Sequence, residues 1–169
     1  MGYVFIHPFL TSKTEKISQL PHGQAENFIS GPSIQYNNIG IAIDFTGNDL
    51  KLIKNAINQG GKSANYTIIH IVESAAARYL GKNTRDYETN LDQDSLVKYQ
   101  TDLKELGYKA NIQIGFGNAA KEITKIIRSQ NIDLLVMGVH GHKGFKDLVF
   151  GTTVDSVRHK TKIPLLIIS

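Results

Sequence analysis

The chain has 169 residues, of which 41% are hydrophobic and 20% charged, values typical of one soluble globular domain. It contains no cysteine, which excludes disulfides and thiolate metal sites and favours, without requiring, a reducing compartment such as the cytoplasm. No apolar run approaches the about 18 residues of a membrane-spanning helix, so we expect no membrane span in this chain.

The net charge of +4 is unevenly distributed along the chain. From Lys121 to the C-terminus there are eight Lys/Arg and four Asp/Glu, whereas the first 120 residues contain eleven of each. A positive local field favours an anionic ligand, but ordinary solubilising charge on helix faces explains the same count. Charge alone therefore leaves both interpretations open.

Residues 1–38 are predicted to form an N-terminal arm or linker, because LPHGQAENFISGPS carries the Pro, Gly and Ser that mark loops. A single folded domain is expected over 39–169. Within it, short apolar runs predict strands at 39–44, 66–72, 109–115, 132–138 and 163–168. Helices are expected at about 46–61, at about 91–106, from Asn118 and after Gly151. This alternation predicts an α/β fold with a parallel sheet covered by helices on both faces.

Local signals predict the ends and the buried faces of these helices. Thr46, followed three residues later by Asp49, resembles a capping pair, and Gly60 and Gly61 suit a helix stop. The apolar positions expected to face the sheet are Leu50, Ile53 and Ile57, then Leu96, Tyr99 and Leu103, then Ile123, Ile126 and Ile127.

The segment DLLVMGVHGHKGFKDLVFGTTVD, residues 133–155, places glycines where a strand should end and a helix should begin. Gly138 closes the predicted fourth strand, and Gly151-Thr152-Thr153 opens the last helix. Glycines leave backbone N–H groups accessible, and the first turn of a helix has unpaired N–H donors with a partial positive charge. Phosphate binds readily at such a helix start. We therefore expect phosphate binding, with a plain glycine-rich connection as the alternative.

Other site motifs fit this sequence less well. The P-loop pattern is absent, and no Gly-x-Ser-x-Gly elbow of a serine hydrolase is present. GFGNAA at 115–120 matches the dinucleotide-binding fingerprint, but the acid about 20 residues later, Asp133, stands at the wrong end of its strand. His140 and His142 lack a third ligand nearby, so no metal site of the protein alone is predicted. No nucleic-acid-binding module is recognisable.

The spacing Gly138-x-x-Gly141, nine residues, then Gly151-Thr152 resembles the signature G-2x-G-9x-G-(S/T) of the ATP-binding branch of the universal stress protein family. Asp44 at the end of the first strand and the segments VMGVHGHKG and KIPLLII resemble the family pattern as well. The resemblance covers about residues 38–169. It implies a doubly wound five-stranded parallel sheet of order 3-2-1-4-5, with ATP or another adenine nucleotide between strands one and four.

The family pattern, carried over residue by residue, implies two groups of nucleotide-binding residues. The group at the nucleoside comprises Ile43, Asp44 and the backbone of Ile71. The group at the ribose and phosphates comprises Gly138, His140, Gly141, Gly151, Thr152 and Thr153. The resemblance also implies Mg²⁺ or Mn²⁺ bound through the nucleotide.

The resemblance implies a stress-response or regulatory module of the cytoplasm rather than an enzyme. No acid is placed to orient water at a γ-phosphate, and Arg158 would reach the nucleotide only in trans or after movement. Three alternatives stay open: a slow ATPase, a nucleotide-free scaffold, and the cytoplasmic regulatory tail of a membrane transporter. The last follows from the 38 residues before the first strand, which is more than family members usually have.

The strand IPLLII at 163–168 is expected at an edge of the sheet, where it would promote aggregation unless covered. Pairing with a symmetric copy would cover this edge. Because family members commonly dimerise through this strand, we expect a homodimer.

Overall fold

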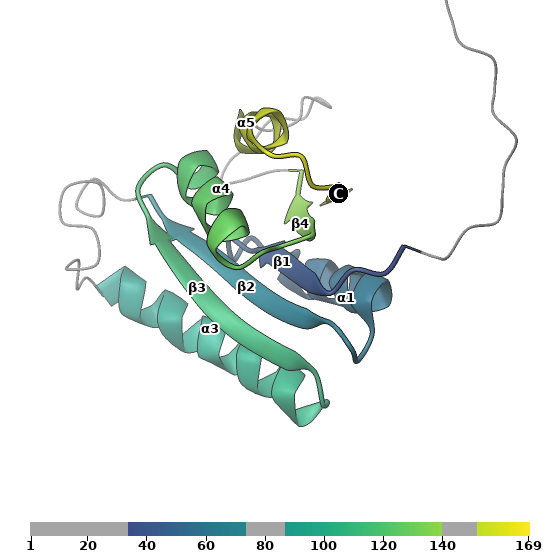
Figure 1. Ribbon diagram of the computed structural model, residues 1–169. Coiled ribbons are helices and arrows are strands. Elements are labelled where there is room, and N and C mark those ends of the chain that lie inside the picture. The colour runs from purple at the N-terminus through teal and green to yellow at the C-terminus, as the bar shows by residue number, and fades with distance from the viewer. Residues whose placement is uncertain (1–33, 74–86, 140–151) are drawn as a thin grey trace, which may run out of the picture. The chain divides into compact units, whose positions relative to one another are not determined.

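The structure is a computed structural model that describes residues 34–73, 87–139 and 152–169 (Figure 1). In chain order its elements are β1 (Asn38–Ala42), α1 (Asp49–Gly60), β2 (Asn65–Val72), α3 (Tyr87–Glu105), β3 (Lys109–Phe116), α4 (Ala119–Ser129), β4 (Leu134–Gly138), α5 (Thr152–Lys160) and β5 (Leu165–Ile168). The predicted boundary between an arm and a domain near residue 38 stays a prediction, because residues 1–33 lie outside the described ranges.

The five strands form one parallel sheet in the order β3-β2-β1-β4-β5, which confirms the predicted fold class and strand order. The central strand β1 pairs on one side with β2, where Gly40 lies opposite Thr67, and on the other with β4, where it lies opposite Leu135. The chain thus adds β2 and β3 on one side of β1 and then crosses over to add β4 and β5 on the other side. In open α/β sheets the ligand crevice lies beyond the carboxyl ends of the strands at this reversal, here between β1 and β4.

Helices cover both faces of the sheet, as predicted for a doubly wound fold (Figure 1). On one face α1 and α3 pack on the sheet through a core that includes Leu52, Leu96 and Tyr66. On the other face α4 and α5 do the same through residues such as Ile123 and Val157. The central strands are buried from both sides, which explains why their sequences are continuously apolar rather than alternating.

The predicted buried faces of α3 and α4 are confirmed, whereas that of α1 is partly wrong. Leu50 is 58% exposed, while Leu52 and Ile53 are 2% and 6% exposed. The buried stripe of α1 comprises Asp49, Leu52, Ile53 and Ala56, which follow the i, i+3, i+4, i+7 spacing of one helix face. A hydrophobic pattern selects Leu50 instead, because the first position of the buried stripe is an acid.

Helix ends follow the predicted chemistry at two of three positions. The Asn118 side chain accepts a hydrogen bond of 3.0 Å from the Lys121 N–H at the start of α4. Gly61, with a φ of 60°, ends α1. The capping pair of Thr46 and Asp49 is wrong: Asn48 precedes α1 without a side-chain cap, and the Thr46 hydroxyl donates to Asp44 instead.

Truncation of the Leu96 side chain should destabilise the domain strongly. Leu96 is fully buried where α3 meets the sheet, so Leu96→Ala should lower the free energy of unfolding by about 2–5 kcal/mol through lost burial and the cavity left behind. Val97 follows it on the same helix at 46% exposure, and Val97→Ala should change stability by no more than about 0.5 kcal/mol. Urea denaturation of both variants measures this difference, and equal losses would contradict the described face of α3.

Candidate functional site

The carboxyl ends of β1 and β4 lie side by side at the point where the strand order reverses. Ala42 of β1 is in register with Met137 of β4, so Ile43 and Gly138 are the next residues along the two neighbouring strand ends. The Ile43 N–H still donates to the Ile69 carbonyl on the opposite side at 2.9 Å. The structure therefore brings Ile43, Asp44 and Gly138, three of the predicted site residues, to one edge of the sheet.

The turn from β1 into α1 is held by Asp44 and contains a strained residue. Asp44 Oδ1 accepts hydrogen bonds from the Thr46 N–H at 3.2 Å and from the Thr46 hydroxyl at 2.6 Å. Between them Phe45 has a φ of 57°, in the left-handed region that a bulky side chain rarely adopts. Such strain is retained mainly where the local geometry serves a function. Both bonds to the carboxylate use Oδ1, which leaves Oδ2 directed to neither of these donors.

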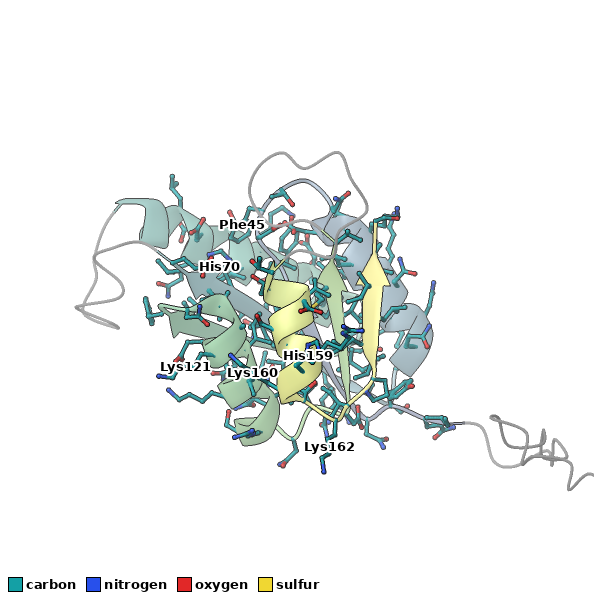
Figure 2. The ribbon with its side chains drawn as sticks, turned by 90° about the horizontal axis from the view of Figure 1, so that it is seen from above. Phe45, His70, Lys121, His159, Lys160 and Lys162 are labelled. Atoms are coloured by element: carbon teal, nitrogen blue, oxygen red, sulfur yellow. The ribbon has the colours of Figure 1, made fainter. Side chains whose placement is uncertain are left out.

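A buried histidine ties the end of β1 to α3. His70 of β2 is 7% exposed, and its Nδ1 lies 3.1 Å from the Ile43 carbonyl oxygen. Its Nε2 lies 3.2 Å from Asp92 Oδ2. The two ring nitrogens thus connect the end of β1 to α3. The Phe45 ring packs on His70 with centroids 4.8 Å apart (Figure 2).

Asp49 is a second buried polar group beneath the same turn. It is 3% exposed, and its Oδ2 accepts a hydrogen bond of 3.3 Å from the Tyr99 hydroxyl. Oδ1 is buried without a hydrogen-bond partner among the described residues. Burial raises the pKa of Asp49 above the ordinary value of 3.8, and the bond from Tyr99 only partly offsets it. Tyr99 also stacks on Phe45 at 6.5 Å between ring centroids, so both buried groups contact the strained turn.

Sequence reasoning missed this polar network. Its one signal was the histidine within the apolar run YTIIHIV, since a histidine buried in a strand needs hydrogen-bond partners. The partners come from the turn after β1 and from α3, which no local pattern connects to β2.

The phosphate end of the predicted site is described in part. Gly138 is the last residue of β4, and the next N–H, that of Val139, donates to the Ile168 carbonyl of β5 at 3.0 Å. Thr152 and Thr153 are the first two residues of α5, as predicted. Because α5 connects two parallel strands, it begins at the carboxyl edge of the sheet, and Figure 2 shows His159 and Lys160 far from Phe45 at its other end. His140, Gly141 and Gly151 lie outside the described residues.

The adenine contact predicted for Ile71 lies one strand further along the same edge. Ile71 is the penultimate residue of β2, half-buried and in register with Gly115 of β3. Its placement at the carboxyl end of β2 agrees with the predicted position, and its contact with a ligand stays a prediction.

No group of three or more His, Cys, Asp or Glu able to hold a metal ion occurs within 34–73, 87–139 and 152–169. Across those same ranges, none of the helices combines the length and the apolar character required to cross a lipid bilayer.

The fold and the spacing of the glycines both agree with one known family. The model of the universal stress protein family matches residues 35–169, and the chain belongs to this family.

Three curated relatives carry the same family name. Universal stress protein Slr1230 of Synechocystis sp. is 35% identical over 82 residues, which cover 47% of this chain and 29% of that protein. Universal stress protein MJ0577 of Methanocaldococcus jannaschii is 25% identical over 96 residues, 53% of this chain and 59% of that protein. Universal stress protein A homolog 1 of Coxiella burnetii is 25% identical over 132 residues, 75% and 91% of the two chains. The matched part is thus less than two thirds of the first two proteins.

Solved structures of the family share the fold. Universal stress protein UspA from Lactobacillus plantarum has a TM-score of 0.68 at 20% identity and covers 81% of this chain and 100% of its own. The Archaeoglobus fulgidus protein in complex with dAMP has a TM-score of 0.61 at 14% identity, with coverage of 79% and 98%. A universal stress protein in complex with cAMP has a TM-score of 0.56 at 18% identity, with coverage of 79% and 96%. At these identities the likeness shows the fold.

Removal of the Asp49 charge should change how stability depends on pH. Because the pKa of Asp49 is raised in the folded state, its stabilising contribution is complete below pH 3.8 and is lost as the pH rises through the folded pKa. Asp49→Asn should therefore gain stability relative to the natural protein between about pH 4 and neutrality. Urea denaturation across this range measures the difference, with Asp94→Asn at an exposed position of α3 as the matched control. A difference that does not change with pH would contradict the cost assigned to the buried carboxylate.

Proposed function

We propose that this universal stress protein domain is an adenine-nucleotide-binding regulatory module of the cytoplasm, with ATP as its ligand, and that it belongs to the ATP-binding branch of the family. One observation carries the proposal. Gly138 ends β4 and Thr152 begins α5, so the glycine-rich signature connects the strand that flanks the reversal point to the helix start beside it. This is the position at which open α/β sheets bind ligands, and a helix start favours phosphate.

The described residues support two roles at this site. At the nucleoside end, the Asp44 carboxylate has an oxygen that the Thr46 bonds do not use, which suits acceptance of a hydrogen bond from a ribose hydroxyl. The Ile71 backbone at the end of β2 is our candidate for the adenine contact. At the other end, the first amides of α5 and the Thr152 hydroxyl are suited to the phosphates, where a divalent cation would enter with the nucleotide. The dAMP and cAMP complexes of two relatives support an adenine ligand.

A regulatory role agrees better with these residues than catalysis does. Arg158 lies near the end of α5 and is paired at 2.9 Å with Asp155, so in this arrangement it does not serve as a cation for a γ-phosphate. Nucleotide binding at this edge of the sheet would change the surface offered to a partner. Slow hydrolysis would be a secondary property, and the transporter-tail hypothesis differs only in what the domain is attached to.

Loss of the Thr152 hydroxyl should weaken nucleotide binding. A hydrogen bond to a charged phosphate oxygen is worth enough that Thr152→Ala should raise the Kd for Mg–ATP by about tenfold or more. Thr101→Ala removes the same group from an exposed position of α3 and should leave the Kd unchanged. Titration calorimetry with Mg–ATP, dAMP and cAMP measures these values.

The double variant Gly141→Val, Thr152→Ala should abolish retention of nucleotide altogether. If it keeps its ATP, the site assignment is wrong, and if the natural protein takes up no adenine nucleotide, the domain is a nucleotide-free scaffold.

We also propose that the protein forms a homodimer through β5, which is an edge strand of the sheet that the structure describes. The Leu135 N–H donates to the Pro164 carbonyl, and the Val139 N–H donates to the Ile168 carbonyl. In a parallel pair alternate residues direct their polar groups to the same neighbour, so Ile167 directs its N–H away from β4. The β5 side chains are only half-buried in one chain. An apolar edge of this kind is stabilised by pairing with a second copy.

Proline at position 167 should break this dimer without breaking the sheet. Ile167→Pro removes an N–H that β4 does not use, and edge strands tolerate proline. Ile167→Val keeps the N–H and is the matched control. Size-exclusion chromatography with light scattering at micromolar concentration should show a dimer for the control and a monomer for the proline variant. A monomeric natural protein would refute the proposed pairing.

A further inference from the structure

A stripe of cations runs along the exposed side of α4. Lys121, Lys125 and Arg128 are exposed and follow the i, i+4, i+7 spacing that places residues on one helix face. At a rise of about 1.5 Å per residue, the stripe extends roughly 10 Å along the helix. The opposite face of α4 packs on the sheet through Ile123 and Ile127, so the stripe faces outward.

This stripe forms one wall of a groove between α4 and α5. The groove measures about 630 Å³, and its lining comprises Lys121, Thr124, Lys125, Arg128, Ser129 and Lys160. Lys160, at the last position of α5, brings a fourth cation to the same groove, and Figure 2 shows it beside Lys121. The lining therefore contains four positive charges and no carboxylate.

Intramolecular ion pairs do not account for most of this charge. Lys125 lies 3.5 Å from Glu122 on its own helix. Within the described part of the chain, no ion pair includes Lys121, Arg128 or Lys160. Four cations of the basic C-terminal segment thus gather in one groove. Lys160 stands at the opposite end of α5 from Thr152, so this groove is not the phosphate end of the candidate site.

The shape and chemistry of the groove distinguish among anionic occupants. A compact phosphate prefers converging backbone N–H groups, and these are engaged within α4, while the Thr124 and Ser129 hydroxyls donate to carbonyls of their own helix. Cations in a line suit an elongated partner with several negative charges. The lining contains no aromatic side chain on which a base could stack, which disfavours single-stranded nucleic acid. A groove also fits a peptide chain better than it fits a flat membrane surface.

We propose that the groove between α4 and α5 is a docking site for an acidic peptide segment of a partner protein. Carboxylates along such a segment would pair with Lys121, Arg128 and Lys160, and Lys125 would exchange Glu122 for the partner. The attraction would steer the partner to this flank of the domain, with salt-dependent affinity. This groove is spatially separate from the nucleotide site proposed at the carboxyl edge.

The test measures binding of fluorescein-labelled octaglutamate to the full chain by fluorescence anisotropy at low ionic strength. The triple variant Lys121→Gln, Arg128→Gln, Lys160→Gln should bind about tenfold more weakly, since three exposed ion pairs are together worth about that factor. The matched control, Lys54→Gln, Lys104→Gln, Lys109→Gln, removes the same net charge from exposed positions outside the groove and should stay within about twofold of the natural protein. Thermal melts establish that both variants are folded.

Four outcomes would overturn the proposal. The first is no binding of octaglutamate by the natural protein, and the second is an equal loss in both triple variants, which would show net charge alone. The third is full competition between Mg–ATP and the peptide for one site, which would assign these cations to the nucleotide site. The fourth is tighter, groove-dependent binding of a single-stranded oligonucleotide or of equimolar phosphatidylserine and phosphatidylcholine vesicles. A protein that takes up no nucleotide but still binds the peptide through the groove would refute only the proposed nucleotide function.

Discussion

The pairing of β1 with both β2 and β4 is the constraint on which the rest of the structure depends. It places β1, the first strand that the structure describes, at the centre of the sheet. The strands β2 and β3 lie on one side of it, and β4 and β5 lie on the other. Gly40 shows how close this packing is, because a Cβ there would lie 2.9 Å from Ile132 Cδ1 and 3.0 Å from Leu135 Cδ1. The same pairing separates the helices after β1 and β4 onto opposite faces and so opens the crevice between them. The site therefore follows from the topology.

Three residues near the β1–α1 turn do not follow the rules of unstrained backbone and paired polar groups that hold in the rest of the core. Phe45 adopts a left-handed backbone, and His70 spans two oxygen atoms. Asp49 is buried, and one of its oxygens has no hydrogen-bond partner among the described residues. Each feature costs free energy, and the apolar core on this face compensates for it. Departures of this kind gather at functional sites more often than elsewhere. Their position under the β1–α1 turn is thus a separate argument for placing the candidate site at the carboxyl edge of the sheet rather than at its amino edge.

The sequence predicted the architecture better than it predicted the site. Apolar runs and cap or stop signals located every strand and helix that the structure describes, because burial on both sides makes such runs continuous. The strand order came from the resemblance to a family. Ends were less accurate: β1 stops at Ala42 and β5 starts at Leu165, since the limits of pairing depend on neighbouring strands. The contact between His70 and Asp92 was not predicted, because the two residues are 22 positions apart and lie in different elements, β2 and α3. Charge counting found the basic segment but not the face on which it gathers.

Helix α5 connects the two surfaces to which functions are proposed. It begins with Thr152 at the carboxyl edge of the sheet and ends with Lys160 in the basic groove. Val154 and Val157 are buried in the same core cluster as the apolar face of α4, so α5 packs on that cluster through two successive turns. A ligand that displaced the first turn of α5 would then shift Lys160 relative to the cations of α4. Coupling of this kind is reciprocal, so an acidic partner in the groove would change nucleotide affinity by the same factor. A regulatory module of the proposed kind would need such a link between the ligand it senses and the partner it binds, and α5 is the helix that connects the two proposed surfaces.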